Sequence, residues 1–146
     1  MIPPRTILAA IDFSETSRTA LVLAARLARD CRAELHVLHA EHPLLDAAVT
    51  YAGIDLAGDT RDEFGRFIAS ASPAAAAAPR LQVVIGAAVD AILEVAHRHT
   101  ADLVVVGSHG LSGAARLVFG LTTEELLRRS PVSVLVAPAA ANPTPH

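Results

Sequence analysis

The chain has 146 residues, of which 52% are hydrophobic and 18% are charged, and its formal net charge at pH 7 is -3. This length predicts one domain, with a core large enough to need neither disulfides nor a structural metal. The slight acidity argues against a broad electrostatic interaction with nucleic acid, and also against a basic membrane-binding surface.

The single cysteine, Cys31, allows no intrachain disulfide and is compatible with a reducing compartment. The first residues lack the basic segment and the apolar run of a signal peptide. No stretch is long and apolar enough to predict a transmembrane helix. We therefore expect a cytoplasmic protein that binds neither membrane nor nucleic acid.

The first part of the chain predicts a strand, a helix and a second strand. Residues 6–11 form an apolar run of strand length that ends at Asp12. Hydroxyl side chains at residues 14–17 offer caps for the following helix. One face of that helix is expected to carry Ala20, Leu23, Ala24, Leu27 and Ala28. Residues 34–39 predict the second strand.

The middle of the chain is the least regular part. Residues 44–70 predict a second helix, which three glycines weaken, and we expect a break near Gly58. Residues 72–79 are rich in alanine and bracketed by prolines, and we interpret them as a linker.

Two more helices and three more strands are expected in the last part of the chain. The strands are at residues 81–85, 102–106 and 133–136. The first helix has an apolar face made of Val89, Ile92, Leu93 and Ala96, and the second covers residues 122–129. We expect one domain over residues 1–137 and a flexible, proline-rich tail over residues 138–146.

Strands that alternate with helices predict right-handed β-α-β units and a parallel sheet. Because the strands are apolar on both faces, we expect helices on both sides of the sheet. Such sheets bind ligands beyond the carboxyl ends of their strands, at the point where the strand order reverses. The residues to inspect are therefore Asp12, after the first strand, and Gly107, after the fourth.

A glycine-rich segment, residues 107–120, directly follows the most apolar strand. Glycines there allow a sharp turn and a close approach of the backbone to a ligand. Backbone amides in such a turn, together with the dipole of the next helix, favour phosphate binding. The segment is neither a Walker loop nor a dinucleotide fingerprint, because it lacks the Lys-Ser/Thr ending of the first and the spacing of the second.

The spacing of Gly107, Gly110 and, after nine further residues, Gly120 resembles the nucleotide motif of the universal stress protein family. Other segments resemble this family in the same order along nearly the whole chain, namely residues 7–14, 35–40, 86–93, 101–110 and 131–136. The resemblance implies an α/β fold with a five-stranded parallel sheet in the order 3-2-1-4-5 and about four helices. It also implies a homodimer joined through the last strand, residues 133–136, and ATP in the cleft, with or without magnesium.

The same resemblance implies roles for individual residues. Asp12 would lie near the ribose or a metal ion, and the backbone around Ala40 would face the adenine. The contacts expected on the phosphate side come from Gly107, His109, Gly110, Gly113, Gly120, Thr122 and Thr123.

Leu121 departs from the family pattern, in which the last glycine is followed by a serine or threonine that contacts phosphate. A hydrogen bond to a charged group contributes about 1.5–3 kcal/mol. Its loss would weaken binding roughly ten- to a hundred-fold. Thr122 would compensate in part only if the loop shifts, whereas contacts from backbone amides do not depend on side chains.

Several residues have a second interpretation. Asp12 is also placed to cap the first helix. We interpret His109 as a brace for the turn rather than a catalytic base, because no Ser or Cys nucleophile with a third partner is evident. His36 and His39 should point to opposite faces of their strand, which argues against a metal site, and His97 and His99 look solvated. We therefore expect no catalytic and no metal-ligating residues.

Three functions compete at this point. The first is a dimeric, ATP-binding regulatory module of the stress response. The second is a dimeric interaction protein of the same fold that binds no nucleotide, which Leu121 makes credible. The third is a slow ATPase or a related hydrolase, which ranks last because no paired carboxylate and no general base other than His109 is evident near the phosphates.

Overall fold

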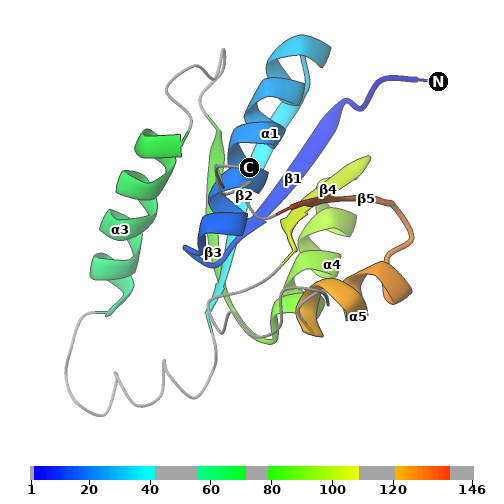
Figure 1. Ribbon diagram of the computed structural model, residues 1–146. Helices are drawn as coiled ribbons and strands as arrows, with labels where there is room; N and C mark the ends of the chain where they lie inside the picture. Colours follow the sequence, from blue (N-terminus) through cyan, green and yellow to red (C-terminus); the bar gives the residue numbers. More distant parts are fainter. Residues whose placement is uncertain (1, 42–55, 72–78, 109–120, 139–146) are drawn as a thin grey trace, which may run out of the picture.

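A five-stranded parallel sheet forms the centre of the protein in the computed structural model, which describes residues 2–41, 56–71, 79–108 and 121–138 (Figure 1). The strands lie in the order β3-β2-β1-β4-β5, and every neighbouring pair is parallel. Their bounds are β1 Thr6–Ile11, β2 Glu34–Glu41, β3 Arg80–Ile85, β4 Leu103–Gly107 and β5 Ser133–Ala137. The expected fold class, strand number and strand order are therefore confirmed.

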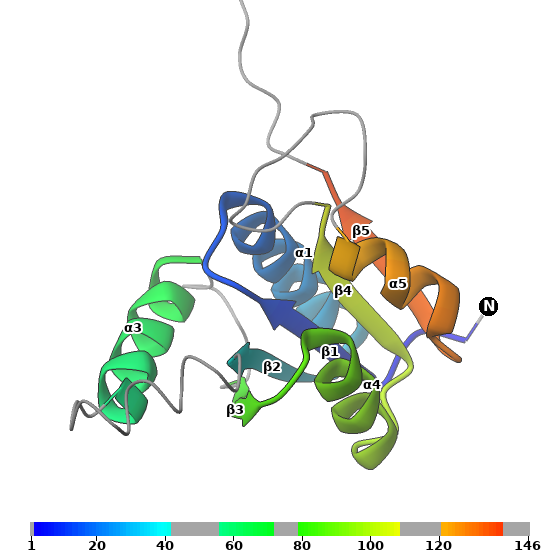
Figure 2. The same ribbon diagram turned by 90° about the horizontal axis from the view of Figure 1, so that it is seen from below.

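Two helices cover each face of the sheet within the described residues (Figures 1 and 2). On one face lie α1 (Glu15–Cys31) and α3 (Leu56–Ala71), and on the other lie α4 (Ala88–Arg98) and α5 (Leu121–Arg129). This two-sided cover explains why the strands are apolar on both faces. None of these described helices has the length and apolar character needed to cross a membrane.

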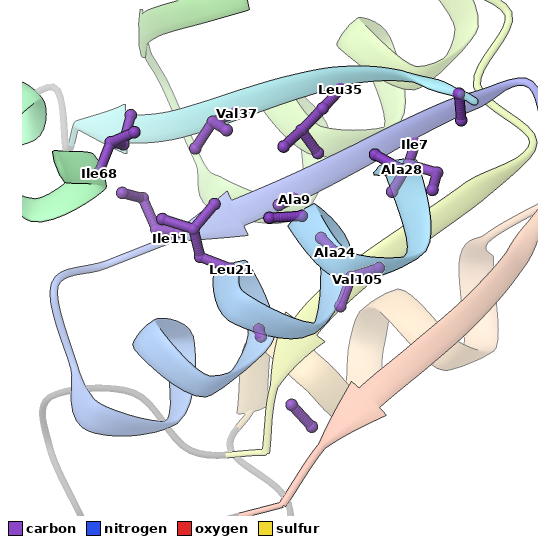
Figure 3. Packing of buried hydrophobic residues seen from close by; sticks show 14 of the residues in the cluster. Ile7, Ala9, Ile11, Leu21, Ala24, Ala28, Leu35, Val37, Ile68 and Val105 are labelled. Carbon is purple, nitrogen blue, oxygen red and sulfur yellow. The ribbon is translucent and has the colours of Figure 1, made fainter. Parts of the chain in front are cut away.

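Alternate residues of the central strand build the two halves of the core. Ile7 and Ile11 of β1 point toward α1 and α3, where they pack with Ala24 and Ile68 (Figure 3). Neither isoleucine is more than 4% exposed. Full burial of such a side chain contributes about 1.5–3 kcal/mol to folding. Leu8, between them in the sequence, points the other way and joins the core beneath α4 and α5.

The buried face of α1 is rotated about the helix axis from the face that the sequence pattern indicates. Leu21 and Ala25 are buried, whereas Leu23 and Leu27, which were expected on this face, are only half-buried. The cause is that α1 packs over both β1 and β4, and the position of these strands decides which side of the helix is buried. The three alanines expected on this face are buried, at Ala20, Ala24 and Ala28.

Helix α3 begins later than the expected helix and is continuous. It starts at Leu56 and runs through Gly58 without the expected break. Phe67 and Ile68 are buried near its end, and packing of this kind stabilises a helix beyond its intrinsic propensity. The earlier part of the expected helix (44–55), most of the expected linker (72–78) and most of the expected tail (139–146) lie outside the described residues.

Asp102 fastens the amino ends of β1 and β4 to each other. One of its carboxylate oxygens, Oδ2, accepts hydrogen bonds from the backbone N–H groups of Arg5 and Thr6, at 2.8 and 3.0 Å. Its own N–H donates to the carbonyl oxygen of Thr6 at 2.9 Å. The two backbone donors lower the pKa of this carboxyl. The strand that the sequence placed from residue 102 therefore begins at Leu103, after this clamp.

Candidate functional site

The strand order reverses between β1 and β4, and a ligand site is expected at the carboxyl ends of these two strands. The chain leaves β1 to enter α1, and α5 begins on the opposite face near the end of β4 (Figure 2). Asp12 directly follows β1, and Gly107 is the last residue of β4. Ala40 lies one strand further along the same edge, next to the end of β2. The fold thus brings these three predicted residues to one edge of the sheet.

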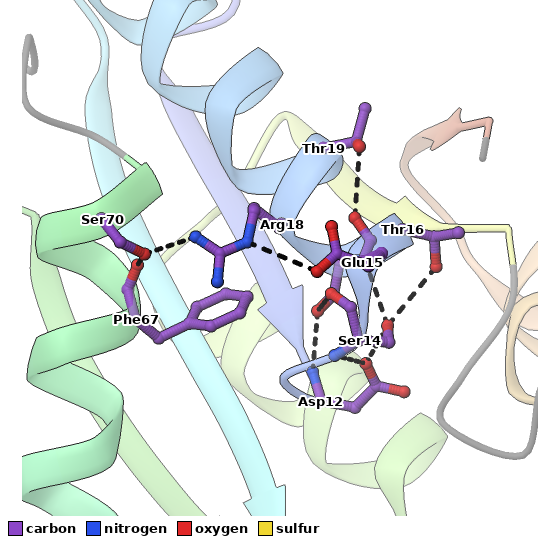
Figure 4. A network of polar contacts seen from close by, with 9 residues as sticks. Asp12, Ser14, Glu15, Thr16, Arg18, Thr19, Phe67 and Ser70 are labelled. Atoms are coloured by element: carbon purple, nitrogen blue, oxygen red, sulfur yellow. Dashed lines mark hydrogen bonds and ion pairs between the residues drawn. The ribbon is translucent and has the colours of Figure 1, made fainter. Parts of the chain in front are cut away.

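The turn after β1 is organised around the carboxylate of Asp12. Its Oδ1 atom accepts hydrogen bonds from the backbone N–H of Ser14, at 3.0 Å, and from the Ser14 hydroxyl (Figure 4). The Ser14 hydroxyl in turn accepts from the N–H of Ser17 at 3.2 Å, which makes Ser14 the N-cap of α1. The interpretation of Asp12 as the helix cap is therefore wrong. Asp12 instead orients the residue that caps the helix.

Gly107 allows the end of β4 to lie directly against the first turn of α1. A Cβ atom at this position would be 2.5 Å from the Thr16 hydroxyl oxygen and 2.8 Å from the backbone nitrogen of Ser17. Real Cβ atoms essentially never approach other atoms so closely, and here part of the obstacle is backbone. The first need for glycine at this position is therefore the packing of α1 on β4, whatever its role toward a ligand.

Thr123 of α5 holds Gly107 from the other face of the sheet. Its hydroxyl donates a hydrogen bond of 2.8 Å to the carbonyl oxygen of Gly107, and the residue is buried. The neighbouring Thr122 is exposed. Next to Gly107, the N–H of Ser108 donates to the carbonyl oxygen of Ala137 at 2.9 Å. The end of β4 is therefore fixed by α1, α5 and β5 at once.

Two helix N-termini contribute positive potential at this edge of the sheet. Both α1 and α5 begin there, and the first turn of each helix presents backbone N–H groups and the positive end of the helix dipole. An acidic residue in each first turn, Glu15 in α1 and Glu124 in α5, offsets part of this field. The groups available at this edge are therefore amide and hydroxyl donors together with carboxylates, of which that of Asp12 directly follows β1.

An aromatic cluster adjoins the turn, and the sequence analysis did not foresee it. The ring of Phe13 lies 4.6 Å from the imidazole of His39 and 5.4 Å from the ring of Phe67, centroid to centroid. The guanidinium carbon of Arg18 lies 4.8 Å from the centroid of the Phe67 ring. Phe13 and Phe67 are far apart in the sequence, and no pattern in it indicated that their rings meet.

The histidines of β2 point to opposite faces of the sheet, as expected. His39 lies against Phe13, while His36 stacks on His99 at the end of α4, with ring centroids 4.3 Å apart. The expectation that His99 is solvated is wrong, because this stack leaves it half-buried. His97 is exposed, as expected.

The pair formed by His36 and His99 lies at the amino edge, away from the candidate site. The Nε2 atom of His36 is 3.0 Å from a carboxylate oxygen of Glu34, which is also 2.7 Å from Nε of Arg80. Burial lowers the pKa of His36, and His99 lowers it further, while Glu34 opposes the change. In the part of the chain that the structure describes, no group of three His, Cys, Asp or Glu side chains is arranged to hold a metal ion.

The remaining predicted site residues lie outside the described residues, namely His109, Gly110, Gly113 and Gly120. Leu121 is the first residue of α5. It therefore occupies the first turn of that helix, as its place after Gly120 suggested.

Comparison with known proteins adds independent information. The model of the Universal stress protein family matches residues 4–138. A curated relative from Thermus aquaticus, described as a universal stress protein in QAH/OAS sulfhydrylase 3'region, is 30% identical over 137 residues. That similarity covers 90% of this chain and 97% of the relative.

Solved structures show the same similarity. A universal stress protein in complex with cAMP is 30% identical, with a TM-score of 0.66, and the comparison covers 94% of this chain and 99% of the other. The universal stress protein UspA from Lactobacillus plantarum is 27% identical, with a TM-score of 0.67, over 91% of this chain and 97% of its own.

Proposed function

The chain belongs to the universal stress protein family, and on that basis we propose that it binds ATP at the carboxyl edge of its sheet, between the ends of β1 and β4. One observation carries the proposal. Ser17, in the first turn of α1, lies beside both Asp12 and Gly107, so that a carboxylate, a helix N-terminus and a close-packed glycine meet at the switch point of the sheet.

Each group at this edge has a chemical role in the proposal. The Asp12 carboxylate would accept hydrogen bonds from ribose hydroxyls or bind magnesium, and the backbone at Ala40 would face the adenine. The phosphates would receive amides from the segment that starts at Gly107, together with the hydroxyl of Thr122, which is exposed. Thr123 would act through the backbone, since its hydroxyl donates to Gly107.

The relative solved in complex with cAMP supports an adenine nucleotide as the ligand, because it is 30% identical over nearly the whole of both chains. We further propose that the protein is a cytoplasmic, homodimeric regulatory module of the stress response and not an enzyme. Its partner strand would be β5, an edge strand whose residues Val134, Leu135 and Val136 are only half-buried.

Leu121 favours a second candidate, a dimeric interaction protein that binds no nucleotide. This apolar residue begins α5, at the position where the family pattern has a hydroxyl that contacts phosphate. The two candidates differ only in occupancy of the site, since both use the same fold and the same dimer.

The test begins with the identity of any small molecule released when the purified protein is denatured. Calorimetric titration with ATP and magnesium then measures affinity, with Asp12→Asn as the test variant. Asp30→Asn is the matched control, because this exposed aspartate lies near the opposite end of α1, where it pairs with Arg29. We expect Asp12→Asn to weaken binding about tenfold and Asp30→Asn to leave it unchanged. If no nucleotide is released and millimolar ATP gives no binding signal, the interaction-only candidate replaces ours.

A further inference from the structure

Phe13 adopts a backbone conformation that is unusual for a bulky residue. Its φ angle is 66°, in the left-handed region that glycine occupies freely and other residues occupy at a cost. Phe13 stands between Asp12, which is proposed to contact the ligand, and Ser14, which caps α1. Its conformation therefore decides how the Asp12 carboxylate is placed relative to the helix.

Two rings hold the side chain of Phe13. The imidazole of His39 lies at 4.6 Å and the ring of Phe67 at 5.4 Å, the latter in an edge-to-face arrangement at 88°. His39 is itself fixed, because its Nδ1 atom is 3.0 Å from the carbonyl oxygen of Ile11. A carbonyl can only accept, so Nδ1 carries the hydrogen and His39 is anchored to the strand that leads into the turn.

Phe67 belongs to the helix α3, whereas His39 belongs to the strand β2. Arg18 of α1 holds Phe67 in place: the guanidinium lies over the ring, 4.8 Å from its centroid, and donates a hydrogen bond to the Ser70 hydroxyl (Figure 4). The Ser70 hydroxyl donates to the carbonyl oxygen of Phe67 at 2.8 Å. One turn of α3 is thus fastened to α1, next to Phe13.

We infer that Phe67 is a positioning residue for the proposed nucleotide site: by bracing Phe13 in the left-handed conformation, it keeps the Asp12 carboxylate in place for the ligand. The inference rests on the proposed function for its ligand, but the bracing itself operates without one. It also gives α3 a role at the site, although α3 supplies none of the predicted ligand contacts.

The test uses Phe67→Leu, which removes the ring and keeps an apolar side chain. Ile68→Val is the matched control, because Ile68 is the next residue of α3 and equally buried in the same core. Amide hydrogen exchange at Ser14, whose N–H donates to Asp12, reports on the turn in ligand-free protein. We expect Phe67→Leu to speed this exchange and to weaken ATP binding, each about tenfold, and Ile68→Val to change neither. Equal effects of the two variants on exchange would overturn the inference.

A double-mutant cycle tests whether Phe67 acts on the site through Phe13. Phe13→Gly removes the cost of the left-handed conformation, so the turn no longer needs a brace. In that background we expect Phe67→Leu to leave ATP affinity unchanged. Additive losses from the two substitutions would show that Phe67 acts only as a core residue. Arg18→Met, with Arg26→Met as the control on the exposed side of α1, replaces Phe67→Leu if that variant does not fold.

The outcomes distinguish this inference from the proposed function. If the natural protein binds no ATP, the proposed function fails, and the Ser14 exchange data still decide whether Phe67 braces the turn. If the natural protein binds ATP and Phe67→Leu changes neither exchange nor affinity, the inference fails and the proposed function stands.

Discussion

Gly107 and Thr16 lie so close together that the strand β4 and the helix α1 leave no space for a side chain between them. A Cβ atom on Gly107 would be 2.5 Å from the Thr16 hydroxyl oxygen and 2.7 Å from its carbonyl carbon. Gly107 is therefore needed for packing, whatever its role toward a ligand. The unfolding of a substituted protein without ligand measures the packing contribution alone.

We expect Gly107→Ala to destabilise the protein by about 1–3 kcal/mol, the usual cost of forcing an extra group into a packed interior. Urea unfolding measures the change. The control is Gly65→Ala in α3, where no atom lies within 4 Å of the added Cβ. That variant should be more stable by about 0.5–1 kcal/mol, because alanine favours a helix more than glycine does. A neutral result for Gly107→Ala would contradict the close packing.

Thr123→Val tests the contact that α5 makes with the end of β4. Valine keeps the shape but removes the donor, so the Gly107 carbonyl loses a partner and stability should fall by about 1 kcal/mol. Thr122→Val is the matched control on the exposed neighbour and should change the free energy of unfolding by less than about 0.5 kcal/mol. Equal losses in the two variants would argue that helix propensity, and not the hydrogen bond, is responsible.

Leu121→Ser restores the hydroxyl that the family pattern has at the start of α5. We expect this variant to bind ATP about tenfold more tightly, which corresponds to about 1.4 kcal/mol. The fold should tolerate the change because residue 121 begins the helix, and serine is favourable near a helix start. Titration with ATP and magnesium is the measurement. Weaker binding by the variant would mean that Leu121 makes a useful contact of its own.

The lowered pKa of His36 predicts that the protein loses stability in mild acid. Burial and His99 lower its pKa below the ordinary 6.5, with a smaller lowering by Arg80, and Glu34 opposes them. The unfolded chain therefore binds this proton more readily than the folded protein does. Stability should fall as the pH drops from about 6.5 toward the folded-state pKa, and it should be fully present above pH 6.5.

Two substitutions at the end of α4 test the origin of this pH effect, one at His99 and a control at His97. His99→Gln removes one of the two main causes of the lowered pKa, so its unfolding free energy should depend less on pH than that of the natural protein. His97→Gln, at an exposed position two residues earlier, should keep the full dependence. Urea unfolding at several pH values compares them, and an identical pH profile for all three proteins would rule out the His36–His99 pair as the origin.

The proposed dimer predicts that a charge on β5 separates the protomers. Val134→Lys places an ammonium on the edge strand at a half-buried position, where pairing with a second copy would bury it. Sedimentation should show a dimer for the natural protein at micromolar concentration and a monomer for the variant. Ser133→Lys, at the exposed first residue of β5, should remain dimeric. A natural protein that sediments as a monomer would refute the dimer outright.

Apolar pattern predicted the strands well, because each strand is a short and mostly apolar segment, although only the inner strands β1, β2 and β4 are largely buried. The bounds of β1 agree to the residue, and those of the other strands agree within two. Pattern could not predict which side of α1 is buried: Leu21 and Leu23 are equally apolar, and only the position of β4 under the helix decides between them. The strand order came from resemblance, since no local feature of a strand specifies its neighbour.

Site residues could be predicted where their place follows from the end of a strand. They could not be predicted where it follows from contacts between side chains that are distant in the sequence. Asp12 and Gly107 follow from the ends of two strands. The cap at Ser14, the hydrogen bond from Thr123 and the bracing of Phe13 by Phe67 all join side chains to partners that a linear pattern does not identify. The roles of the predicted ligand contacts remain predictions.

The clamp that Asp102 forms with Arg5 and Thr6 has a consequence for synthesis of the protein on the ribosome. The bonded residues are 97 and 96 positions apart, and β4 is the neighbour of β1 on that side. The nascent chain can pair β1 with β2 early, but the other edge of β1 stays open until residues 103–107 have emerged. At about 5–20 residues per second, the interval between the end of β2 and the start of β4 is roughly 3–12 seconds. During that time we expect one edge of this apolar strand to be unpaired, which leaves the newly made chain open to aggregation and to binding by chaperones.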